Sequence, residues 1–281
     1  MRVSQKMENF DLDYLQKKYG KAKTEMLSRM SVTQRVRSAR QPRLGYIKAK
    51  DFTMKMLGEG IDALNPIENV KPTLIGLAVD YLTRFMTGTS AAESFRISLL
   101  GAEMLNESIR AKKMIELMKG LDNASIRYAI QLAAYDPVFR AGVFEYPPDD
   151  EISPDEETAE NVRTMVTRSI HFFEVFGKKI LDGFTFEGGY TDTVLKGDGD
   201  FTTHDTLWEF KVSKFPPNKD HTLQLLIYWR LGLHSIHQEF RNIKYLGIFN
   251  PRRNETYRIA VDDIPSDVIK VVEANVIGYM N

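Results

Sequence analysis

The segment "GDGDFTTHDTLWEFKVSK", residues 197–214, constrains the fold of this chain more than any other stretch. It sets acidic residues among Thr, Phe, Trp and Val, the residue types that favour β-strands. A two-residue turn at His204-Asp205 would fold it into a hairpin in which Asp200 lies opposite Glu209. The segment therefore predicts a hairpin that carries two directly opposed carboxylates.

Strand alternation also predicts what the two faces of this hairpin carry. Asp198 and Lys211 lie opposite each other on the face of Asp200 and Glu209, while the other face carries core residues: Phe201, Trp208, Phe210 and Val212. One interpretation is an ordinary amphipathic hairpin with a solvated face. The other is a metal site, because like charges about 5 Å apart repel and a divalent cation removes that conflict. For Asp198 we expect an ion pair with Lys211 rather than a second metal.

Three motifs follow one another in this part of the chain: Gly197-x-x-Asp200, Glu209-x-Lys211 and Gln224-x-x-x-Tyr228. Together they resemble the PD-(D/E)XK nuclease superfamily, and in particular its RecB-like branch. The Pro-Asp pair of the family name is absent, but that branch commonly has Gly-x-x-Asp in its place. The resemblance covers about residues 158–262. It implies a restriction-endonuclease-like core in which a mixed central sheet is flanked by helices.

The resemblance also implies roles for individual residues. Asp200 and Glu209 would bind Mg²⁺ or Mn²⁺ together with the backbone carbonyl of Phe210. Lys211 would position the attacking water. From the following helix, Gln224 would orient substrate or nucleophile, and Tyr228, one turn later, would support the same face.

Members of this superfamily usually place a further acid or a histidine on a helix before the strands. Glu174 in "HFFEVFG" is the first candidate, because the neighbouring phenylalanines predict a buried turn, and His171 shares its face. Asp80 in "GLAVDYLTRFM" is the rival if residues 90–157 form an inserted helical subdomain.

A basic segment precedes the helical part of the chain. Seven basic residues and no acidic one lie between Arg29 and Lys50. One interpretation is a solvated helix face followed by a linker. The other is an arm that contacts nucleic-acid phosphates, for which the expected contacts are Arg35, Arg37, Arg40, Arg43 and Lys48.

The pattern along the chain predicts a mixed α/β fold, of the α+β kind. With the resemblance, it implies three parts: an N-terminal helical and basic segment (1–66), a helical subdomain (67–157) and the nuclease-like core (158–281). Helical periodicity marks residues 5–30, 73–86, 90–119, 123–134 and 158–179, and a proline-rich acidic loop covers 146–158. Ser31 and Gln34 have the spacing of a capping box. Two strands are expected around the "NPRRN" turn, followed by a C-terminal amphipathic helix.

Composition narrows the function classes. The 281 residues include no cysteine, which excludes disulfides, thiol nucleophiles and Cys-ligated zinc. There is no long apolar run and no signal-peptide pattern, so we expect a cytoplasmic protein without membrane contact. There is no P-loop, and the histidines lack the spacing of a zinc helix. The formal net charge is zero, so a protein partner or a homodimer would have to add to the affinity for nucleic acid.

These observations together predict a Mg²⁺- or Mn²⁺-dependent nuclease that hydrolyses phosphodiester bonds, with DNA as the expected polymer and repair or defence among the implied settings. Two alternatives stay open. One is a non-catalytic module that keeps a nuclease-like fold for binding nucleic acid or protein. The other is a nuclease that is inactive until a partner binds its N-terminal half.

Overall fold

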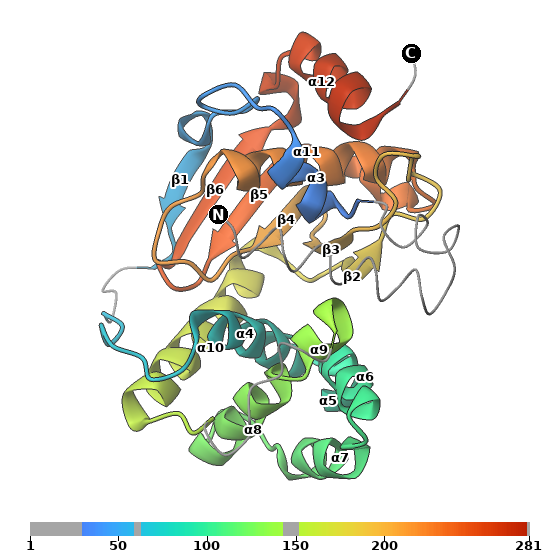
Figure 1. Cartoon of the computed structure of the whole chain (residues 1–281). Coiled ribbons are helices and arrows are strands. Elements are labelled where there is room, and N and C mark those ends of the chain that lie inside the picture. Colours follow the sequence, from blue (N-terminus) through green and yellow to red (C-terminus); the bar gives the residue numbers. More distant parts are fainter. Residues whose placement is uncertain (1–29, 59–62, 143–151, 280–281) are drawn as a thin grey trace.

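The computed structural model describes residues 30–58, 63–142 and 152–279 (Figure 1). The helix expected over residues 5–30 lies outside the described residues, apart from Met30. The same holds for residues 146–151 of the expected acidic loop. Among the described residues, no helix is both long enough and apolar enough to span a membrane.

A six-stranded mixed sheet forms one part of the molecule, with the strand order β1-β6-β5-β4-β3-β2. Strands β4 and β5 run parallel, and every other neighbouring pair is antiparallel. This mixed sheet flanked by helices confirms the expected mixed α/β class. The strands are β1 (Thr53–Met56), β2 (Leu181–Thr185), β3 (Asp198–Thr202), β4 (Thr206–Phe210), β5 (Tyr245–Asn250) and β6 (Glu255–Ala260).

Helices cover the sheet and form a second layer below it (Figure 1). The segment expected as one helix over 90–119 is instead broken into three, and Asn106 takes a positive φ of 60° at the second break. The α-helices are α3 (Val32–Ser38), α4 (Pro72–Met86), α5 (Ala91–Ser94), α6 (Arg96–Met104), α7 (Ser108–Leu117), α8 (Asn123–Ala133), α9 (Asp136–Ala141), α10 (Glu156–Phe176), α11 (Lys219–His234) and α12 (Ser266–Val272). Short 3₁₀ turns occupy Ala49–Asp51, Gln238–Asn242 and Val261–Asp263, and a π-helical turn at Glu273–Ile277 follows α12.

The expected hairpin register is confirmed. Phe201 pairs with Trp208 and Thr202 with Leu207, and the Thr203 N–H donates to the Thr206 carbonyl at 2.9 Å across the turn. The same register continued along the strands sets Asp200 opposite Glu209. The two strands expected around the "NPRRN" turn are also confirmed, because β5 and β6 form an antiparallel pair on either side of it.

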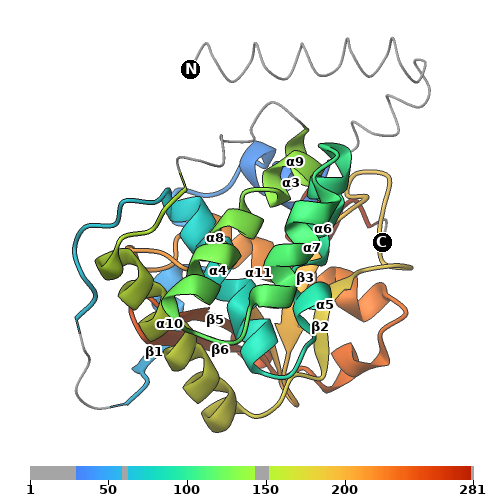
Figure 2. The same ribbon diagram turned by 90° about the horizontal axis from the view of Figure 1, so that it is seen from below.

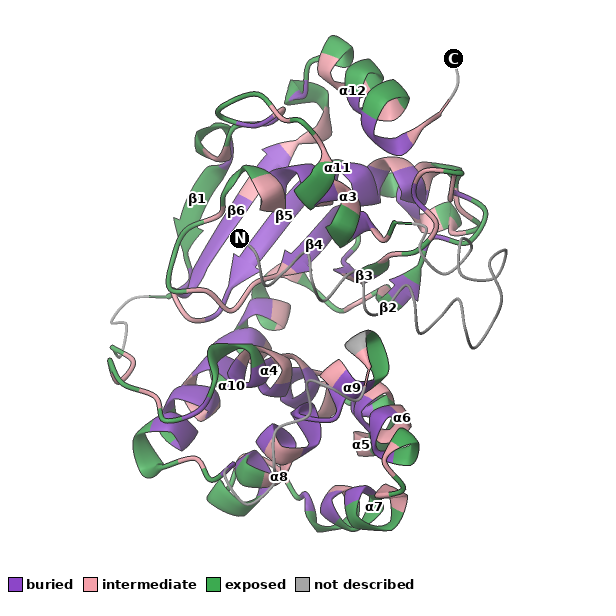
Figure 3. Cartoon of the chain, in the orientation of Figure 1, coloured by how far each residue is buried: buried purple, intermediate pink, exposed green. Residues whose placement is uncertain are grey.

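The two faces of the sheet bury different cores, and most residues of the central strands β4 and β5 are buried (Figure 3). On one face, α11 and α3 pack over Leu207, Leu246 and Ile248. On the other face, Phe172 of α10 stacks on Phe249 at 4.3 Å between ring centroids and meets Trp208 edge-on. Alternate residues of β4 therefore belong to opposite layers of the molecule.

A helical layer, α4 to α9, is inserted in the chain between β1 and β2 (Figures 1 and 2). It packs around its own apolar core, to which α10 contributes Val162 and Met165. Asn161 of α10 binds both backbone groups of Asn65: it accepts from the N–H at 2.7 Å and donates to the carbonyl at 3.0 Å. The start of the insertion is thus attached to the helix that ends it.

The N-terminal part of the chain belongs to the sheet layer. The capping box is confirmed, since the Ser31 hydroxyl accepts from the Gln34 N–H at 3.2 Å and the Gln34 side chain accepts from the Ser31 N–H at 2.8 Å. Helix α3 packs on α11, and β1 pairs with β6. Residues 158–281 therefore do not contain the whole sheet. Strand β1 was not expected from the sequence.

Candidate functional site

Asp200 and Glu209 meet beside the C-terminal end of β4, where the sheet adjoins the helical layer. Their shared register puts both side chains on the face covered by α11. The Asp200 carboxylate also accepts a hydrogen bond from the Phe210 N–H at 2.7 Å. The side chain of Glu209 is only 3% exposed, and Asp200 is half-buried opposite it.

A glycine allows this corner of the sheet to close. At Gly197, three residues before Asp200, an added Cβ would lie 2.7 Å from the Val32 side chain and 3.4 Å from the Tyr228 ring. Val32 begins α3, and Tyr228 lies on α11. The first position of the Gly-x-x-Asp motif is therefore explained by the close approach of two helices to the strand that carries the acid.

Lys211 contacts only one of the two carboxylate oxygens of Glu209. Its Nζ lies 2.5 Å from Glu209 Oε1. The other carboxylate oxygen, Oε2, is buried and makes no hydrogen bond within the described part of the chain. A buried carboxylate oxygen without a partner costs free energy, and native sites rarely leave one in this state. Two carboxylates thus face a single ammonium group, so a further cation would be attracted to this pair.

Burial and like charge dominate the electrostatics of the pair. Burial raises the pKa of Asp200 well above its ordinary value, and the nearby charges of Glu209 and Asp80 raise this pKa further. Lys211 and the Phe210 N–H oppose the shift without cancelling it. For Lys211 itself, burial lowers the pKa, but Glu209 and Asp200 outweigh burial and the pKa is raised. Lys211 is therefore an ammonium group at neutral pH.

Helix α11 supplies three more side chains to this face. Gln224 Nε2 donates to the Tyr228 hydroxyl at 2.9 Å, and burial together with Glu209 and Asp200 raises the pKa of that hydroxyl. His221, one turn before Gln224, was not expected in the site. Burial and the neighbouring Lys211 lower its pKa to about 4, so it is neutral at pH 7. Its spacing of three residues from Gln224 was the available sequence signal.

The helical layer contributes Asp80 and Arg84, both from α4. Asp80 is close enough to raise the pKa of Asp200, and it holds Arg84 at 3.2 Å. Arg84 also lies 3.8 Å from Asp182 of β2. Its guanidinium fills the space beside Gly183, where a Cβ would lie 2.5 Å from Nη1. Sequence reasoning missed Arg84, because its contacts with the sheet, Asp182 and Gly183, lie about 100 residues later in the chain.

The structure does not bring Glu174 to this site. The expectation that Glu174 lies on a buried turn of its helix is wrong. Its side chain is 68% exposed and pairs with His171 at 3.0 Å. Helix α10 turns Phe172 toward the sheet, on the face opposite to the carboxylate pair. Only one side of that helical turn is buried, and Glu174 lies on the other side. Asp80, the rival candidate, is the acid that lies near Asp200.

The expected ion pair between Asp198 and Lys211 is also wrong. Asp198 pairs with Arg140 at 3.0 Å, while Lys211 pairs with Glu209. Arg140 follows Asp136 by one helical turn on α9 and holds that buried carboxylate as well, at 3.0 Å. Asp198 therefore forms its ion pair with the helical layer and not with the neighbouring strand.

The basic segment divides into two kinds of residue. The Arg35 guanidinium donates to the Val276 carbonyl at 2.7 Å and to the Asn275 carbonyl at 2.6 Å, so it holds the C-terminal turn in place. The other expected contacts are exposed and form no ion pair within the described residues: Arg37, Arg40, Arg43 and Lys48. Their segment is attached to the start of α11, because Gln41 donates to Asp220 at 2.7 Å.

The donor set fits a hard divalent cation. Two carboxylates and a backbone carbonyl are oxygen ligands of the kind that Mg²⁺ and Mn²⁺ prefer, with waters in the remaining positions. The unpartnered Oε2 of Glu209 is an observation of the structure that such an ion would explain. In the described ranges, no group of three or more His, Cys, Asp or Glu side chains is arranged around a common point. Asp80 is thus a neighbour of the pair rather than a third ligand in this arrangement.

Comparisons with protein-family models, with curated proteins and with solved structures find no match for this chain.

Proposed function

We propose that this protein is a Mg²⁺- or Mn²⁺-dependent nuclease that hydrolyses phosphodiester bonds, with DNA as its expected substrate. One observation carries the proposal: the buried Glu209, opposite Asp200, keeps a carboxylate oxygen without a partner in the described part of the chain, beside an ammonium group. A structural hairpin has no reason to place two acids opposite each other and bury one of them against a single lysine. A hydrolytic site that holds a divalent cation does.

Asp200 and Glu209 would hold the cation, together with the Phe210 carbonyl. When bound, the cation supplies an activated water and offsets negative charge on the phosphate. The protein's own contribution is to keep both carboxylates in fixed positions. The Phe210 N–H fixes Asp200, and the salt bridge to Lys211 fixes Glu209.

Lys211 would act as a hydrogen-bond donor rather than as a base. Its raised pKa keeps the proton on Nζ. An ammonium at this position can orient a water or bind a phosphate oxygen as negative charge develops there. The proton released by the attacking water must therefore go to solvent or to a phosphate oxygen, and not to Lys211.

Gln224, Tyr228 and the neutral His221 would line the same side. The Gln224 amide donates one hydrogen to Tyr228 and keeps its second hydrogen for substrate. The raised pKa of Tyr228 keeps its hydroxyl protonated at neutral pH, so it can donate as well.

The test is a cleavage assay on the full-length protein with Mg²⁺ or Mn²⁺, using single- and double-stranded DNA and RNA. We expect wild-type protein to cut at least one of these polymers, and Asp200→Ala or Lys211→Ala to abolish cutting. Asp192→Ala and Lys196→Ala are matched controls, since both side chains are exposed. Cleavage that survives in Asp200→Ala would assign the activity to another site or to a contaminant.

A second candidate, activation by a partner, is supported by the burial of the site. Glu209 is almost inaccessible, and the Arg140–Asp198 ion pair joins the helical layer to the strand beside it. A partner that displaces this layer would open the site. Calorimetric titration separates both kinds of nuclease, which take up Mn²⁺ in an Asp200-dependent way, from a non-catalytic binding module, which does not.

A further inference from the structure

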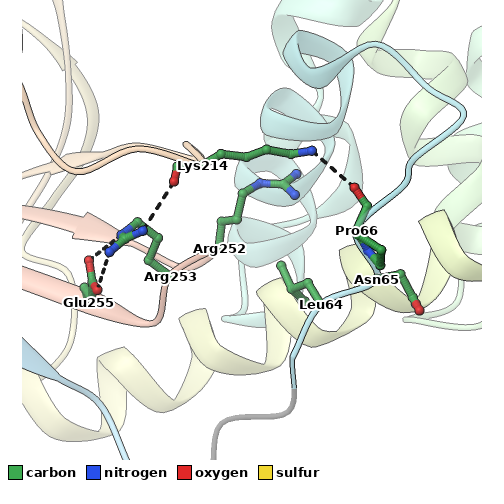
Figure 4. A pocket seen from close by; sticks show the side chains of 7 residues that line it. All are labelled: Leu64, Asn65, Pro66, Lys214, Arg252, Arg253 and Glu255. Carbon is green, nitrogen blue, oxygen red and sulfur yellow. Dashed lines mark hydrogen bonds and ion pairs between the residues drawn. The ribbon is translucent and has the colours of Figure 1, made fainter.

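A positively charged cavity of about 470 Å³ lies just beyond the end of β4 (Figure 4). It is formed where the loop after β4 and the turn between β5 and β6 meet the start of the helical insertion. Lys214, Arg252 and Arg253 line it, with Glu255 as its acidic residue. Neither the carboxylate pair nor the basic segment contributes to this cavity.

The three cations differ in how they are bound. Arg252 pairs with Glu68 at 2.8 Å in a buried contact, and Arg253 binds Glu255 through both Nε and Nη2. The Lys214 ammonium contacts only the Pro66 carbonyl, at 3.4 Å, and has no acidic partner among the described residues. Lys214 is therefore the cation of this cavity whose charge is free for an anion.

The loop that carries Lys214 is fixed by hydrogen bonds. The buried Asn250 amide donates to the Ser213 carbonyl at 2.8 Å, and Arg253 donates to the Lys214 carbonyl at 3.3 Å. The Phe215 N–H donates to the Ser213 hydroxyl at 3.0 Å. The backbone of this loop is therefore held from both sides.

Phe215 is presented to solvent by this fixed loop. It is 76% exposed, and no ring contact with another described residue holds it. The same loop carries Lys211, four residues earlier, so the Cα atoms of the two residues lie at most about 14 Å apart. An exposed aromatic ring and an ammonium without an acidic partner among the described residues are thus carried by adjacent residues, within a few nucleotides of the carboxylate pair.

We infer that Lys214 and Phe215 form a subsite for single-stranded nucleic acid, in which Lys214 binds a backbone phosphate and the Phe215 ring stacks on a base beside the scissile bond. A duplex offers only base edges in its grooves, whereas an unpaired base offers its whole face to a ring. This inference rests on the proposed function, because it names the substrate class of the same site.

The test is fluorescence anisotropy with a labelled 20-mer of thymidine and a labelled duplex of equal length, in EDTA so that nothing is cleaved. We expect Phe215→Ala to weaken binding of the single strand about 5- to 150-fold, the range for loss of one stacked base. Phe215→Leu should weaken it nearly as much, because leucine has no aromatic face. Lys214→Ala should reduce the slope of log Kd against log salt by about 0.7.

Phe139→Ala, on α9, and Lys270→Ala, on α12, are the matched controls and should leave Kd unchanged. Unchanged binding by Phe215→Ala, an equal loss for single strand and duplex, or no binding by wild-type protein would each overturn the subsite. The outcome is separable from that of the proposed function. A subsite that binds without any metal-dependent cleavage refutes the nuclease alone, while Asp200-dependent cleavage without a Phe215 effect refutes the subsite alone.

Discussion

Replacing Asp200 with Asn should make the metal-free protein more stable. At a separation of about 5 Å across the hairpin, Asp200 and Glu209 repel by about 3 kcal/mol at an effective dielectric constant near 20. Asn keeps an oxygen that can accept from the Phe210 N–H, so the hydrogen bond survives the change. After allowance for relaxation, we expect the free energy of unfolding to rise by about 1–3 kcal/mol, against the usual trend for buried substitutions.

The gain in unfolding free energy of Asp200→Asn should increase with pH. Because the pKa of Asp200 is raised in the folded protein, its carboxyl is neutral at low pH and costs little there. The cost grows as pH rises from the ordinary pKa of aspartate, where the unfolded chain ionises, to the raised folded-state pKa, and it is complete above that pKa. Asp200→Asn removes this cost, so its advantage over wild-type protein should be largest at alkaline pH.

Thermal unfolding in EDTA and in Mn²⁺ measures both effects. For a chain of this size, each kcal/mol moves Tm by about 2–4 °C. Mn²⁺ at one hundred times its Kd should add about 2.7 kcal/mol to wild-type protein and nothing to Asp200→Asn. Asp198→Asn is the control: its side chain is 59% exposed, and losing its surface ion pair should cost at most about 1 kcal/mol. If Asp200→Asn were less stable than wild-type protein in EDTA, and if Mn²⁺ raised its Tm as much as that of wild-type protein, the reasoning would be refuted.

Three further predictions concern residues around the site. Gly247→Ala should lower the free energy of unfolding by about 1–3 kcal/mol, measured in urea, because a Cβ would lie 2.4 Å from the buried Trp208 ring. Gly120→Ala, with open space around the added Cβ, should not lower it. Arg252→Met should lower the free energy of unfolding by about 3–5 kcal/mol, because it leaves the Glu68 carboxylate buried without its ion-pair partner. Adding Glu68→Gln should restore most of that loss. Burial and Lys211 lower the pKa of His221 to about 4, so the stability that this neutral imidazole contributes should be lost as pH falls from about 6.5 to about 4. In a Tm series over this range, wild-type protein should lose stability relative to His221→Gln, and an equal change in both proteins would contradict this.

What could be predicted from sequence was mainly local. The register of the β3–β4 hairpin follows from its turn and from strict alternation, because a one-residue slip would exchange the Phe201–Trp208 face for the acidic one. The capping box of α3 likewise depends on residues only three positions apart. In both cases the deciding contacts lie within a dozen residues.

The errors concern contacts made over long separations. Asp198 could not be assigned to Arg140, 58 residues earlier in the chain, without knowing that the helical layer lies against β3. The aromatic neighbours of Glu174 favour it over Asp80 because they indicate burial, yet one helical turn can bury Phe172 on one side and expose Glu174 on the other. Strand β1 is four residues long, and all four are exposed, so neither length nor an apolar run marked it.

The position of β1 at the edge of the sheet has a consequence for how the chain folds. Its partner β6 lies about 200 residues later, as the 201-residue separation between Lys55 and Thr256 shows. During synthesis, β1 must therefore wait until nearly the whole chain has been made before it can pair. Met54 and Met56 remain on an unpaired strand throughout that time. Strand β1 thus joins the sheet only after β6 has been made, and a truncation before residue 255 would leave β1 without a partner.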